Sequence, residues 1–481
     1  MSAETLAQGI PYPHNKSLSF SARVFSSVLA SSDAICALAS GTTLYISYLG
    51  WHSTTYPTYV GASALGALLL TSALNHAGFH TPHLGNDFLR HVKGIVSIWI
   101  GVFFALILAA YVLKISSNVS RVWSFAWFGS VMLLLVAQRI LLWKLILRAA
   151  LLGKLTQRTV ILGGGDPGKR LLKHLEQWAE PWVKVVGVFD DRIARIGPSI
   201  RDYPLMGNLE DLLQFVSEQR VDNVLIALPW TAEQRLWQII ERLRELSVDV
   251  YFAPDGVGLI DSELKFRFIA RTPMLGVVSK PINGWDRLLK EAEDRLIALP
   301  LLLLLMPTIL LIAVAIKLNS EGPVFFRQER RGLNKKTFEI LKFRTMYHKR
   351  CLENDFRQAQ QNDLRVTRVG RFLRRTSLDE LPQLFNVLKG DMSLIGPRPH
   401  PVWLDEEHAA RIEGYFARNR VKPGITGWAQ VNGFRGETRT PHKMKMRIAH
   451  DIYYIENWSL LFDIRILFMT VFVGFIHKNA Y

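Results

Sequence analysis

Cysteine is nearly absent from this chain, since Cys36 and Cys351 are the only two in 481 residues. Two cysteines exclude a disulfide framework and a cysteine-ligated metal site. Acidic residues are also few, 41 against 58 Lys and Arg, which gives a formal net charge of +17. Such an excess is typical of proteins whose partner is nucleic acid, an anionic membrane surface or a phosphate-bearing ligand.

Long, mostly apolar segments occupy the first third of the chain. Hydrophobic residues make up 49% of the sequence although 21% are charged, which indicates that apolar segments are separate from charged ones. Four such segments are each long enough to cross roughly 30 Å of hydrocarbon as a helix: residues 25–49, 59–79, 92–113 and 122–145. The first is the weakest, because it carries Asp33. They predict a four-helix transmembrane domain over residues 21–148 and favour membrane and phosphate partners over nucleic acid.

Basic residues on the short loops predict how this bundle is oriented. The loop after the first segment has no Lys or Arg, whereas Arg90 and Lys93 precede the third and a basic cluster follows the fourth. Both ends of the bundle are therefore expected in the cytoplasm, although Lys114 and Arg121 run against this orientation. Residues 1–20 have no small-residue cleavage site after a short apolar core, so we interpret them as a cytoplasmic segment.

An α/β pattern follows the bundle and predicts a Rossmann-like domain over residues 149–280. Its strands are expected at 159–162, 183–189, 224–228 and 248–252, and its helices at 169–178, 209–219 and 232–246.

A glycine motif lies between the first strand and the first helix of this domain. Gly163, Gly165 and Gly168 match the G-x-G-x-x-G of dinucleotide-binding domains, and Asp190 ends the second strand about where a ribose-binding acid would lie. Nucleotide binding is one interpretation. The other is that the glycines serve only the turn and the packing of the helix.

A fifth apolar segment, residues 296–316, carries no charge and could also cross a membrane. A full crossing would put everything after it on the opposite face from the Rossmann-like domain, yet both flanks are basic, so neither end is favoured for translocation. Pro307 removes a helical hydrogen bond midway and favours a bend. We expect a re-entrant membrane helix at 293–318 that turns near Met306 and Pro307, with a simple span as the alternative.

Residues 281–481 are expected to form a basic α/β catalytic domain on that helix. Segments 324–328 and 338–344 predict a β-hairpin. Most basic side chains here are interpreted as a solvated or lipid-facing surface, whereas Lys342 and Arg344 are candidates for contact with phosphate.

The segment RRTSLDELPQ, residues 374–383, places two adjacent carboxylates, Asp379 and Glu380, at an expected helix start. Unpaired N–H groups and the positive end of the helix dipole would keep Asp379 ionised there and attract phosphate, which suits an aspartate that acts on a phosphorylated substrate. The alternative is a capping box that begins at Ser377. Pro382 disfavours it, because the proline would then fall at the fifth helical position.

Two later segments carry further candidates. Arg398 stands between two prolines, which suits a phosphate clamp, although a structural turn is as ordinary a use. The glycine-rich segment 422–433 could contact a base or a sugar, and Gln430 is its substrate-binding candidate. Residues 458–476 are apolar but interrupted by two charges, which favours an interfacial amphipathic helix over another span.

Four motifs together resemble the bacterial sugar transferase family, the polyprenol-phosphate phosphoglycosyl transferases. They are KFRTM at 342–346, SLDELPQ at 377–383, GDMSLIGPRP at 390–399 and KPGITGWAQVNG at 422–433. This catalytic resemblance covers residues 285–481. The whole chain, with its four spans and Rossmann-like middle, is similar to the large members that act as undecaprenyl-phosphate glucose-1-phosphate transferases in exopolysaccharide synthesis.

The resemblance implies transfer of a sugar-1-phosphate, glucose in the large members, from a UDP-sugar to undecaprenyl phosphate with release of UMP. It places the reaction on the cytoplasmic face of a bacterial inner membrane. It implies a covalent phospho-sugar intermediate on Asp379 and a Mg²⁺ ligand at Glu380. Arg374 and Arg398 match phosphate-binding arginines of the family, and Lys342 is a weaker match. No catalytic role is implied for the Rossmann-like domain, which leaves regulation or a homodimer contact.

One departure from the family and two rival hypotheses remain. Small members carry Ser-Pro at the membrane bend, whereas this chain has Met306-Pro307 and lacks that hydroxyl. An NAD-dependent nucleotide-sugar epimerase or dehydratase would need a Tyr-x-x-x-Lys pair, and none occurs between Asp190 and Lys290. A membrane sensor would leave Asp379 and its neighbouring carboxylate without a role.

Overall fold

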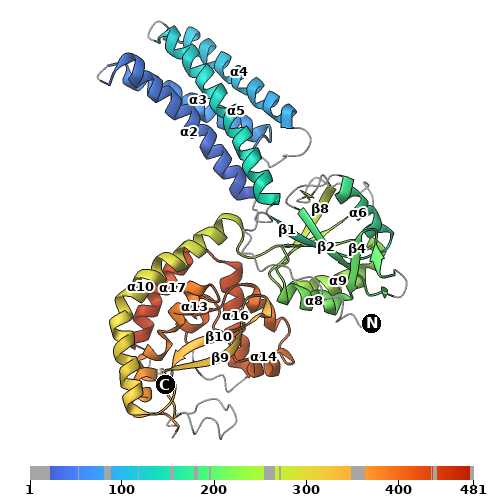
Figure 1. The fold of residues 1–481 in the computed structure, drawn as a ribbon, viewed down its shortest axis with the longest axis vertical. Coiled ribbons are helices and arrows are strands. Elements are labelled where there is room, and N and C mark those ends of the chain that lie inside the picture. The colour runs from blue at the N-terminus through green and yellow to red at the C-terminus, as the bar shows by residue number, and fades with distance from the viewer. Residues whose placement is uncertain are drawn as a thin grey trace. The chain divides into compact units, whose positions relative to one another are not determined.

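The computed structural model describes most of the chain. The described residues are 22–51, 54–80, 88–116, 119–151, 156–177, 183–193, 197–253, 266–269, 272–347, 363, 365–434, 436 and 441–476. Figure 1 shows a helical bundle, a sheet domain and a C-terminal domain. The bundle belongs to one compact unit, and the second unit contains the C-terminal domain with most of the sheet domain. The predicted cytoplasmic segment at residues 1–20 and Cys351 lie outside the described residues.

The predicted spans are confirmed as helices long and apolar enough to cross a membrane. They are α2 (Ala22–Leu49), α3 (Tyr56–His76), α4 (Phe88–Val112) and α5 (Arg121–Leu151). Buried tryptophans tie α5 to α2, because Trp123 Nε1 donates to Gly41 O at 3.0 Å and Trp127 Nε1 to Ala37 O at 2.9 Å. Each indole therefore fills the core and also satisfies its own N–H.

Asp33, which weakened the prediction of the first span, is fully buried and paired. Its two carboxylate oxygens accept hydrogen bonds from Arg139 Nη1 at 2.9 Å and Nη2 at 2.7 Å, and His80 Nε2 lies 3.0 Å away. An ionised group among apolar helices is stable only with such a partner. The charge in α2 is therefore matched by a charge in α5.

The sheet domain has strands in the order β3-β4-β2-β1-β5-β6-β8-β7. β2 pairs with β4 and β5 with β6 in parallel, whereas β3–β4 and β6–β8 are antiparallel. The order reverses at β1, so this strand ends at the point where ligands bind in open α/β sheets.

The strands are β1 (Gln157–Leu162), β2 (Val183–Phe189), β3 (Ser199–Ile200), β4 (Tyr203–Gly207), β5 (Asn223–Ile226), β6 (Asp249–Phe252), β7 (Phe266–Ile269) and β8 (Thr272–Val278). The helices are α6 (Asp166–Gln177), α8 (Leu209–Glu218), η2 (Trp230–Ala232) and α9 (Glu233–Leu243).

The C-terminal domain begins with α10 (Gly284–Asn319) and a hairpin of β9 (Phe325–Arg331) and β10 (Thr337–Phe343), which confirms the predicted hairpin. Its other strands are the parallel pair β11 (Ser393–Ile395) and β12 (Gly424–Thr426). Its helices are η3 (Leu333–Lys335), α12 (Arg368–Thr376), η4 (Leu378–Glu380), α13 (Gln383–Lys389), α14 (Val402–Ala409), η5 (Tyr415–Arg420), α15 (Trp428–Val431), α16 (Pro441–Glu456) and α17 (Leu460–Ile476).

The helix α10 is continuous through Pro300 and Pro307. Figure 1 shows it along one side of the domain, next to α17. Ala298 and Ile316, on either side of Pro307, belong to the same hydrophobic core as Phe343 of β10. The predicted re-entry into the membrane stays a prediction.

The helix α17 is attached to α10 by a buried ion pair. Lys290 Nζ donates to Asp463 Oδ2 at 2.6 Å, and Tyr454 and Trp458 donate to the same carboxylate. The outer face of α17 remains apolar, with exposed Leu461, Ile464, Phe468, Val471 and Phe472. Both features agree with a helix that packs on a domain and faces lipid on its other side.

The open edge of β10 is covered by a side chain. Asn386 of α13 accepts from Leu341 N at 3.0 Å and donates to Glu339 O at 2.7 Å, so its amide replaces a neighbouring strand. Asn386 is 2% exposed, and no water could take over these bonds without opening the packing.

We predict that Asn386→Ala destabilises the C-terminal domain by about 2 kcal/mol, because a buried N–H and a buried carbonyl lose their partner. Thermal unfolding of the full chain in detergent, followed by tryptophan fluorescence, measures the change. Asn457→Ala is the matched control, since that amide is exposed and bonds only Tyr453 O. Equal unfolding temperatures for the two variants would contradict the role given to Asn386.

Candidate active site

The two adjacent carboxylates lie on the short turn η4, between α12 and α13. Ser377 joins α12 to this turn in the left-handed conformation, with φ +57°. That reversal lets the chain leave α12 and present Asp379 and Glu380 on a 3₁₀ turn. Consecutive side chains of such a turn point about 120° apart, so the two carboxylates face different neighbours.

The predicted helix start at Asp379 is wrong. The helix α13 begins at Gln383 with Pro382 as its N-cap, so the helix start comes after the two carboxylates. The capping box is also wrong, because Ser377 makes no capping hydrogen bond to η4. Pro382, which has no N–H to donate, is the N-cap of α13.

Glu380 is held between two cations. Its Oε1 accepts hydrogen bonds from Lys342 Nζ of β10 at 2.7 Å and from Arg398 Nη2 at 2.6 Å, and Oε2 accepts from Arg398 Nη1 at 3.3 Å. Burial alone would raise the pKa of Glu380, but Arg398 and Lys342 outweigh burial and hold it well below its usual range. The two cations therefore favour the ionised form of Glu380.

Asp379 is the less constrained carboxylate. Among the described residues it receives no hydrogen bond, although Lys342, Arg374 and Arg398 act on its charge. Burial and the charge of Glu380 raise the pKa of Asp379, and the three cations oppose this rise. The site therefore contains one carboxylate fixed by ion pairs and one that accepts no hydrogen bond in the described part of the chain.

The parallel strands β11 and β12 bring Arg398 into the site. Gly424 N donates to Pro397 O at 2.9 Å, directly before Arg398. A Cβ on Gly396 would lie 2.5 Å from Lys422 O, and a Cβ on Gly424 would lie 2.1 Å from Gly396 N. Glycine is required at both positions because the two backbones approach too closely for any side chain.

Arg344 and Gln430 have other partners. Arg344 Nη1 donates to Glu321 O at 2.6 Å and Nη2 to Ser320 O at 2.7 Å, directly after α10. It thus satisfies carbonyls at the end of α10, and its contact with phosphate stays a prediction. Gln430 Nε2 donates to Ile425 O at 3.1 Å, while its buried Oε1 has no partner in the described part of the chain. That acceptor keeps Gln430 a substrate-binding candidate.

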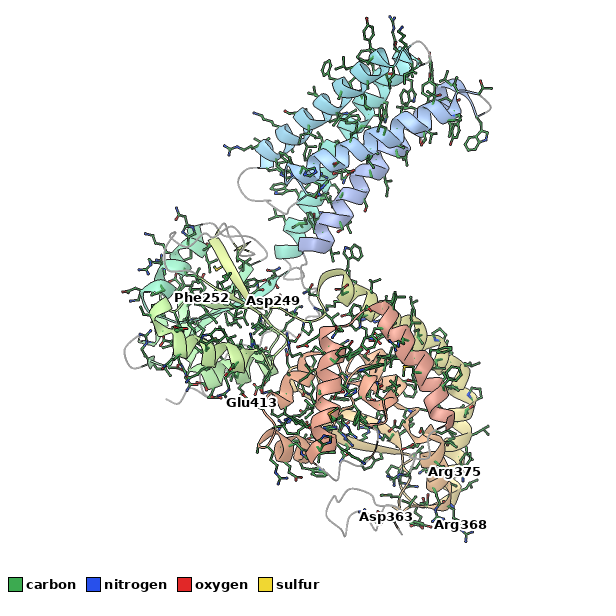
Figure 2. All side chains as sticks on the ribbon, turned by 180° about the vertical axis from the view of Figure 1, so that it is seen from behind. Asp249, Phe252, Asp363, Arg368, Arg375 and Glu413 are labelled. Carbon is green, nitrogen blue, oxygen red and sulfur yellow. The ribbon has the colours of Figure 1, made fainter. Side chains whose placement is uncertain are left out.

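Basic residues also lie on α12, beside the site. Figure 2 shows Arg368 and Arg375 of this helix at the same end of the domain as Asp363. Phe372, on the same helix, is exposed. A basic helix with an exposed aromatic side chain is typical of a surface that meets anionic headgroups.

Mg²⁺ is bound in many phosphate-processing sites by one or two carboxylates and the oxygens of the substrate phosphates. Asp379 and Glu380 provide such a pair. No group of three or more His, Cys, Asp or Glu that could hold a metal occurs among the described residues. The residues therefore fit an ion that is shared with a phosphorylated substrate, and they do not form a closed metal cage.

Close packing explains why two residues of the glycine motif in the sheet domain are glycines. Gly163 has φ +115°, and a Cβ there would lie 2.4 Å from Ala227 O. A Cβ on Gly168 would lie 2.0 Å from Gly163 O, whereas the nearest neighbour of one on Gly165 is Arg192 at 3.3 Å. Gly163 and Gly168 are thus needed for the turn and for helix packing.

Asp190, at the end of β2, bonds the glycine loop itself. Its Oδ2 accepts from Gly164 N at 2.7 Å, and its Oδ1 accepts from Arg192 Nε at 3.1 Å. Burial would raise the pKa of Asp190, but the bonds from Arg192 and Gly164 lower it. This geometry favours the packing interpretation of the glycines, and nucleotide binding at Gly163, Gly165 and Gly168 stays a prediction.

Several buried or half-buried polar residues next to the site could not be predicted from the sequence. Only His400 had a usable signal, because it directly follows the Pro-Arg-Pro motif. The others reach the site from elements far apart in the sequence: Arg330, Asp405, Tyr415, Arg418, Arg447 and Asp451.

Comparisons with known proteins agree with this arrangement. The family described as Bacterial sugar transferase matches residues 285–477, and the family described as CoA-binding domain matches residues 75–254. The UDP-glucose:undecaprenyl-phosphate glucose-1-phosphate transferase of Xanthomonas campestris pv. campestris is 35% identical over 475 residues, which cover 96% of this chain and 97% of that protein.

Two further relatives match a part of the chain. The protein of the same name from Escherichia coli (strain K12) is 43% identical over 325 residues, 67% of this chain and 68% of the relative. The UDP-N-acetylgalactosamine-undecaprenyl-phosphate N-acetylgalactosaminephosphotransferase of Aeromonas hydrophila is 45% identical over 224 residues, 47% of this chain and 52% of the relative. The described residues include five helices apolar enough to cross a membrane, and one relative matches nearly end to end. The chain is therefore a multi-pass membrane enzyme that belongs to the bacterial sugar transferase family.

Proposed function

We propose that the protein transfers glucose-1-phosphate from UDP-glucose to undecaprenyl phosphate and yields undecaprenyl-diphospho-glucose and UMP, the first step of an exopolysaccharide repeat unit. The relative that matches along nearly the whole chain carries the name of this activity. The structural observation that carries the proposal is the pair of carboxylates, in which Glu380 is fixed by Lys342 and Arg398 while Asp379 is unbonded.

In the first step, an oxygen of Asp379 attacks the phosphorus that bears glucose. The bond from this phosphorus to the bridging oxygen breaks, its electron pair leaves with UMP, and an aspartyl phospho-glucose forms. Lys342, Arg374 and Arg398 surround Asp379 and offset the negative charge of the two reacting groups.

In the second step, a phosphate oxygen of undecaprenyl phosphate attacks the same phosphorus. The phosphorus–oxygen bond to Asp379 breaks and the carboxylate is restored, so atoms and charge balance over the cycle. Glu380 remains ionised in both steps, which keeps Lys342 and Arg398 in the site between them.

Mg²⁺ would be held by Glu380 together with oxygens of the diphosphate, in keeping with the donor set on η4. When bound, the ion supplies neutralisation of the diphosphate and of the departing UMP. The positions of Lys342 and Arg398 on the same carboxylate limit how far that carboxylate can move.

The site is proposed to lie on the cytoplasmic face of the bacterial inner membrane, with α10 as a re-entrant helix. Ala298, Leu302, Ile309 and Ile316 pack into one domain core on both sides of Pro307. A full crossing would draw one half of α10 away from that core, so the packing of both halves supports placing both ends of the helix on one face.

Asp379→Asn is expected to reduce UMP release from UDP-glucose by at least about 1000-fold, because an amide cannot form the acyl phosphate. Incubation with sugar-labelled UDP-glucose before lipid is added should leave a labelled phospho-sugar on Asp379 in the wild type, as found by peptide mass spectrometry. Asp391→Asn, a change of the same kind at a carboxylate that pairs with Lys389, should retain activity. An unlabelled Asp379 in active enzyme would rule out the covalent route.

Glu380→Gln is expected to raise the Mg²⁺ concentration needed for half-maximal activity by about 10-fold or more, since a charged oxygen ligand is lost. Titration of UMP release with Mg²⁺ measures this. Glu339→Gln on β10 is the control, because Glu339 is exposed and pairs only weakly with Arg327 at 3.5 Å. An unchanged Mg²⁺ dependence in Glu380→Gln would count against a ligand role.

Lys342→Gln is expected to move the acidic limb of the pH–rate profile to higher pH. Lys342 lowers the pKa of Asp379, so its removal raises that pKa further and protonates the nucleophile at a higher pH. The profile of kcat/KM between about pH 5 and pH 8 tests the direction. Lys389→Gln, at an exposed position, should leave the limb in place, and a shift to lower pH in Lys342→Gln would contradict the assignment.

A further inference from the structure

The backbone that carries Arg398 is held at three consecutive carbonyls. Both flanking residues are prolines, which have no N–H to donate, so only their carbonyl oxygens can anchor the segment. The oxygens of Pro397, Arg398 and Pro399 each accept one hydrogen bond. The donors are Gly424 N at 2.9 Å, Arg418 Nη2 at 2.5 Å and Arg330 Nη1 at 3.1 Å.

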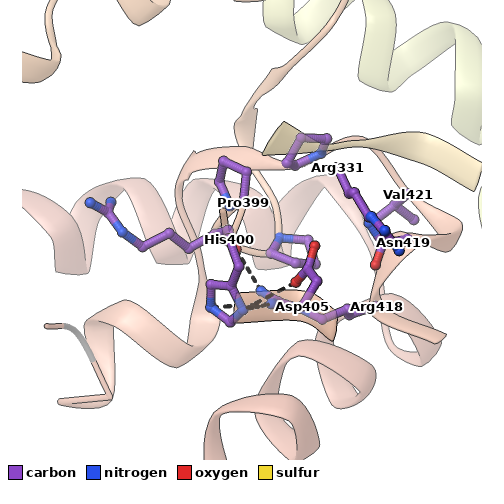
Figure 3. Close-up of a pocket in the computed structure, with 10 residues that line it drawn as sticks. Arg331, Pro399, His400, Asp405, Arg418, Asn419 and Val421 are labelled. Atoms are coloured by element: carbon purple, nitrogen blue, oxygen red, sulfur yellow. Dashed lines mark hydrogen bonds and ion pairs between the residues drawn. The ribbon is translucent and has the colours of Figure 1, made fainter. Parts of the chain in front are cut away.

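Arg418 is the donor to the middle carbonyl, that of Arg398 itself. It lies on η5, is 4% exposed, and pairs with Asp451 of α16 at 2.8 Å. Its other terminal nitrogen, Nη1, lies 2.5 Å from Nδ1 of His400. Figure 3 shows His400, Asp405 and Arg418 directed toward one another. A guanidinium contacts several acceptors in one fixed plane, so these contacts determine the orientation of Arg418.

The surroundings of Arg418 are themselves fixed. Tyr415 OH donates to Asp405 Oδ1 at 2.7 Å and lies 2.7 Å from His400 Nδ1, while Arg447 Nη1 lies 3.2 Å from His400 Nε2. Burial and the neighbouring arginines hold the pKa of His400 well below its usual range, so the ring is neutral and does not repel Arg418. In the described part of the chain, Glu380 is bonded by Lys342 and Arg398 and by no side chain of this network.

We propose that Arg418 is a positioning residue: its bond to the Arg398 carbonyl fixes the Pro-Arg-Pro segment so that the Arg398 side chain meets Glu380. Arg398 Nη2 lies 2.6 Å from Glu380 Oε1, a contact that a shift of about 1 Å in the backbone would break. Arg418 therefore acts on the reaction only through Arg398. The effect on turnover rests on the proposed function, whereas the effect on Glu380 does not.

The first test is a double-mutant cycle on full-length protein in detergent. Arg418→Lys keeps the charge but cannot bond the Arg398 carbonyl and Asp451 in one plane, and we expect UMP release to fall about 10- to 100-fold in kcat with a smaller change in KM. In an Arg398→Ala background the same change should cost less than about 3-fold, because the residue through which Arg418 acts is gone. Arg411→Lys is the control, since Arg411 is exposed and pairs with Glu407. Equal losses in both backgrounds would overturn the proposal.

The second test needs no turnover. Phenylglyoxal modifies accessible arginine side chains, so Arg398, which is held on Glu380, should react slowly in the wild type and faster in Glu380→Gln. Arg418→Lys should raise the reactivity of Arg398 toward the level of Glu380→Gln, as measured by peptide mass spectrometry. Tyr415→Phe, which removes only the hydroxyl, should give a smaller change in the same direction and is the readout if Arg418→Lys does not fold. Reactivity of Arg398 at the wild-type level in the folded variants would overturn the proposal, whereas a wild type that reacts as expected but releases no UMP would contradict only the proposed function.

Discussion

One carboxylate shared by two cations determines how this site is built. Lys342 and Arg398 repel each other, and burial raises the free energy of each charged group. The two cations therefore need Glu380 between them to remain side by side. Together with Arg374 and Asp379 the cluster holds three positive and two negative charges. Before a substrate arrives the site is therefore nearly balanced, and the single excess positive charge favours an anion. A diphosphate supplies that anion without leaving any carboxylate or cation buried alone.

This cluster forms only if separate segments meet within tenths of an ångström. Several local structural features bring these segments together. The left-handed Ser377 turns the chain from α12 into η4, and the glycines at positions 396 and 424 let β11 and β12 approach closely enough to present Arg398. Asn386 covers the edge of β10 and fixes the strand that carries Lys342. Each of these features adjoins a helix or a strand. Lys342 of β10 and Arg398 after β11 can therefore both bond the Glu380 carboxylate on η4.

The sequence predicts those parts of the site that are local in the chain. Hydrophobic runs predict the spans, and turn residues between two strand segments predict the hairpin. The structure confirms both. The adjacent carboxylates indicate where the site lies. The predicted helix start at Asp379 is wrong, because α13 begins only at Gln383. The turn before it is held by Lys342 and Arg398, which lie on other segments and leave no local pattern in the sequence. Arg344 bonds carbonyls after α10, which its sequence motif did not indicate, since a basic side chain in a motif does not reveal which acceptors it reaches; its contact with phosphate stays a prediction. Arg418 gave no signal at all, because its function depends on a carbonyl in a distant segment.

Charges inside apolar helices follow the same rule as the charges of the site. Asp33 weakened α2 as a predicted span, and Asp463 interrupts α17, yet both are buried and paired with a cation on another helix, Arg139 and Lys290. The mean hydropathy of a segment is lowered by such a residue, because it is calculated for one helix without its neighbours. In the folded chain each pair fixes the register of two helices, since sliding either helix by one turn would leave a charge unpaired among hydrocarbon groups. For α10 this matters directly to the site: the helix that Lys290 ties to α17 also shares a hydrophobic core with Phe343 and Leu373, the sequence neighbours of Lys342 and Arg374.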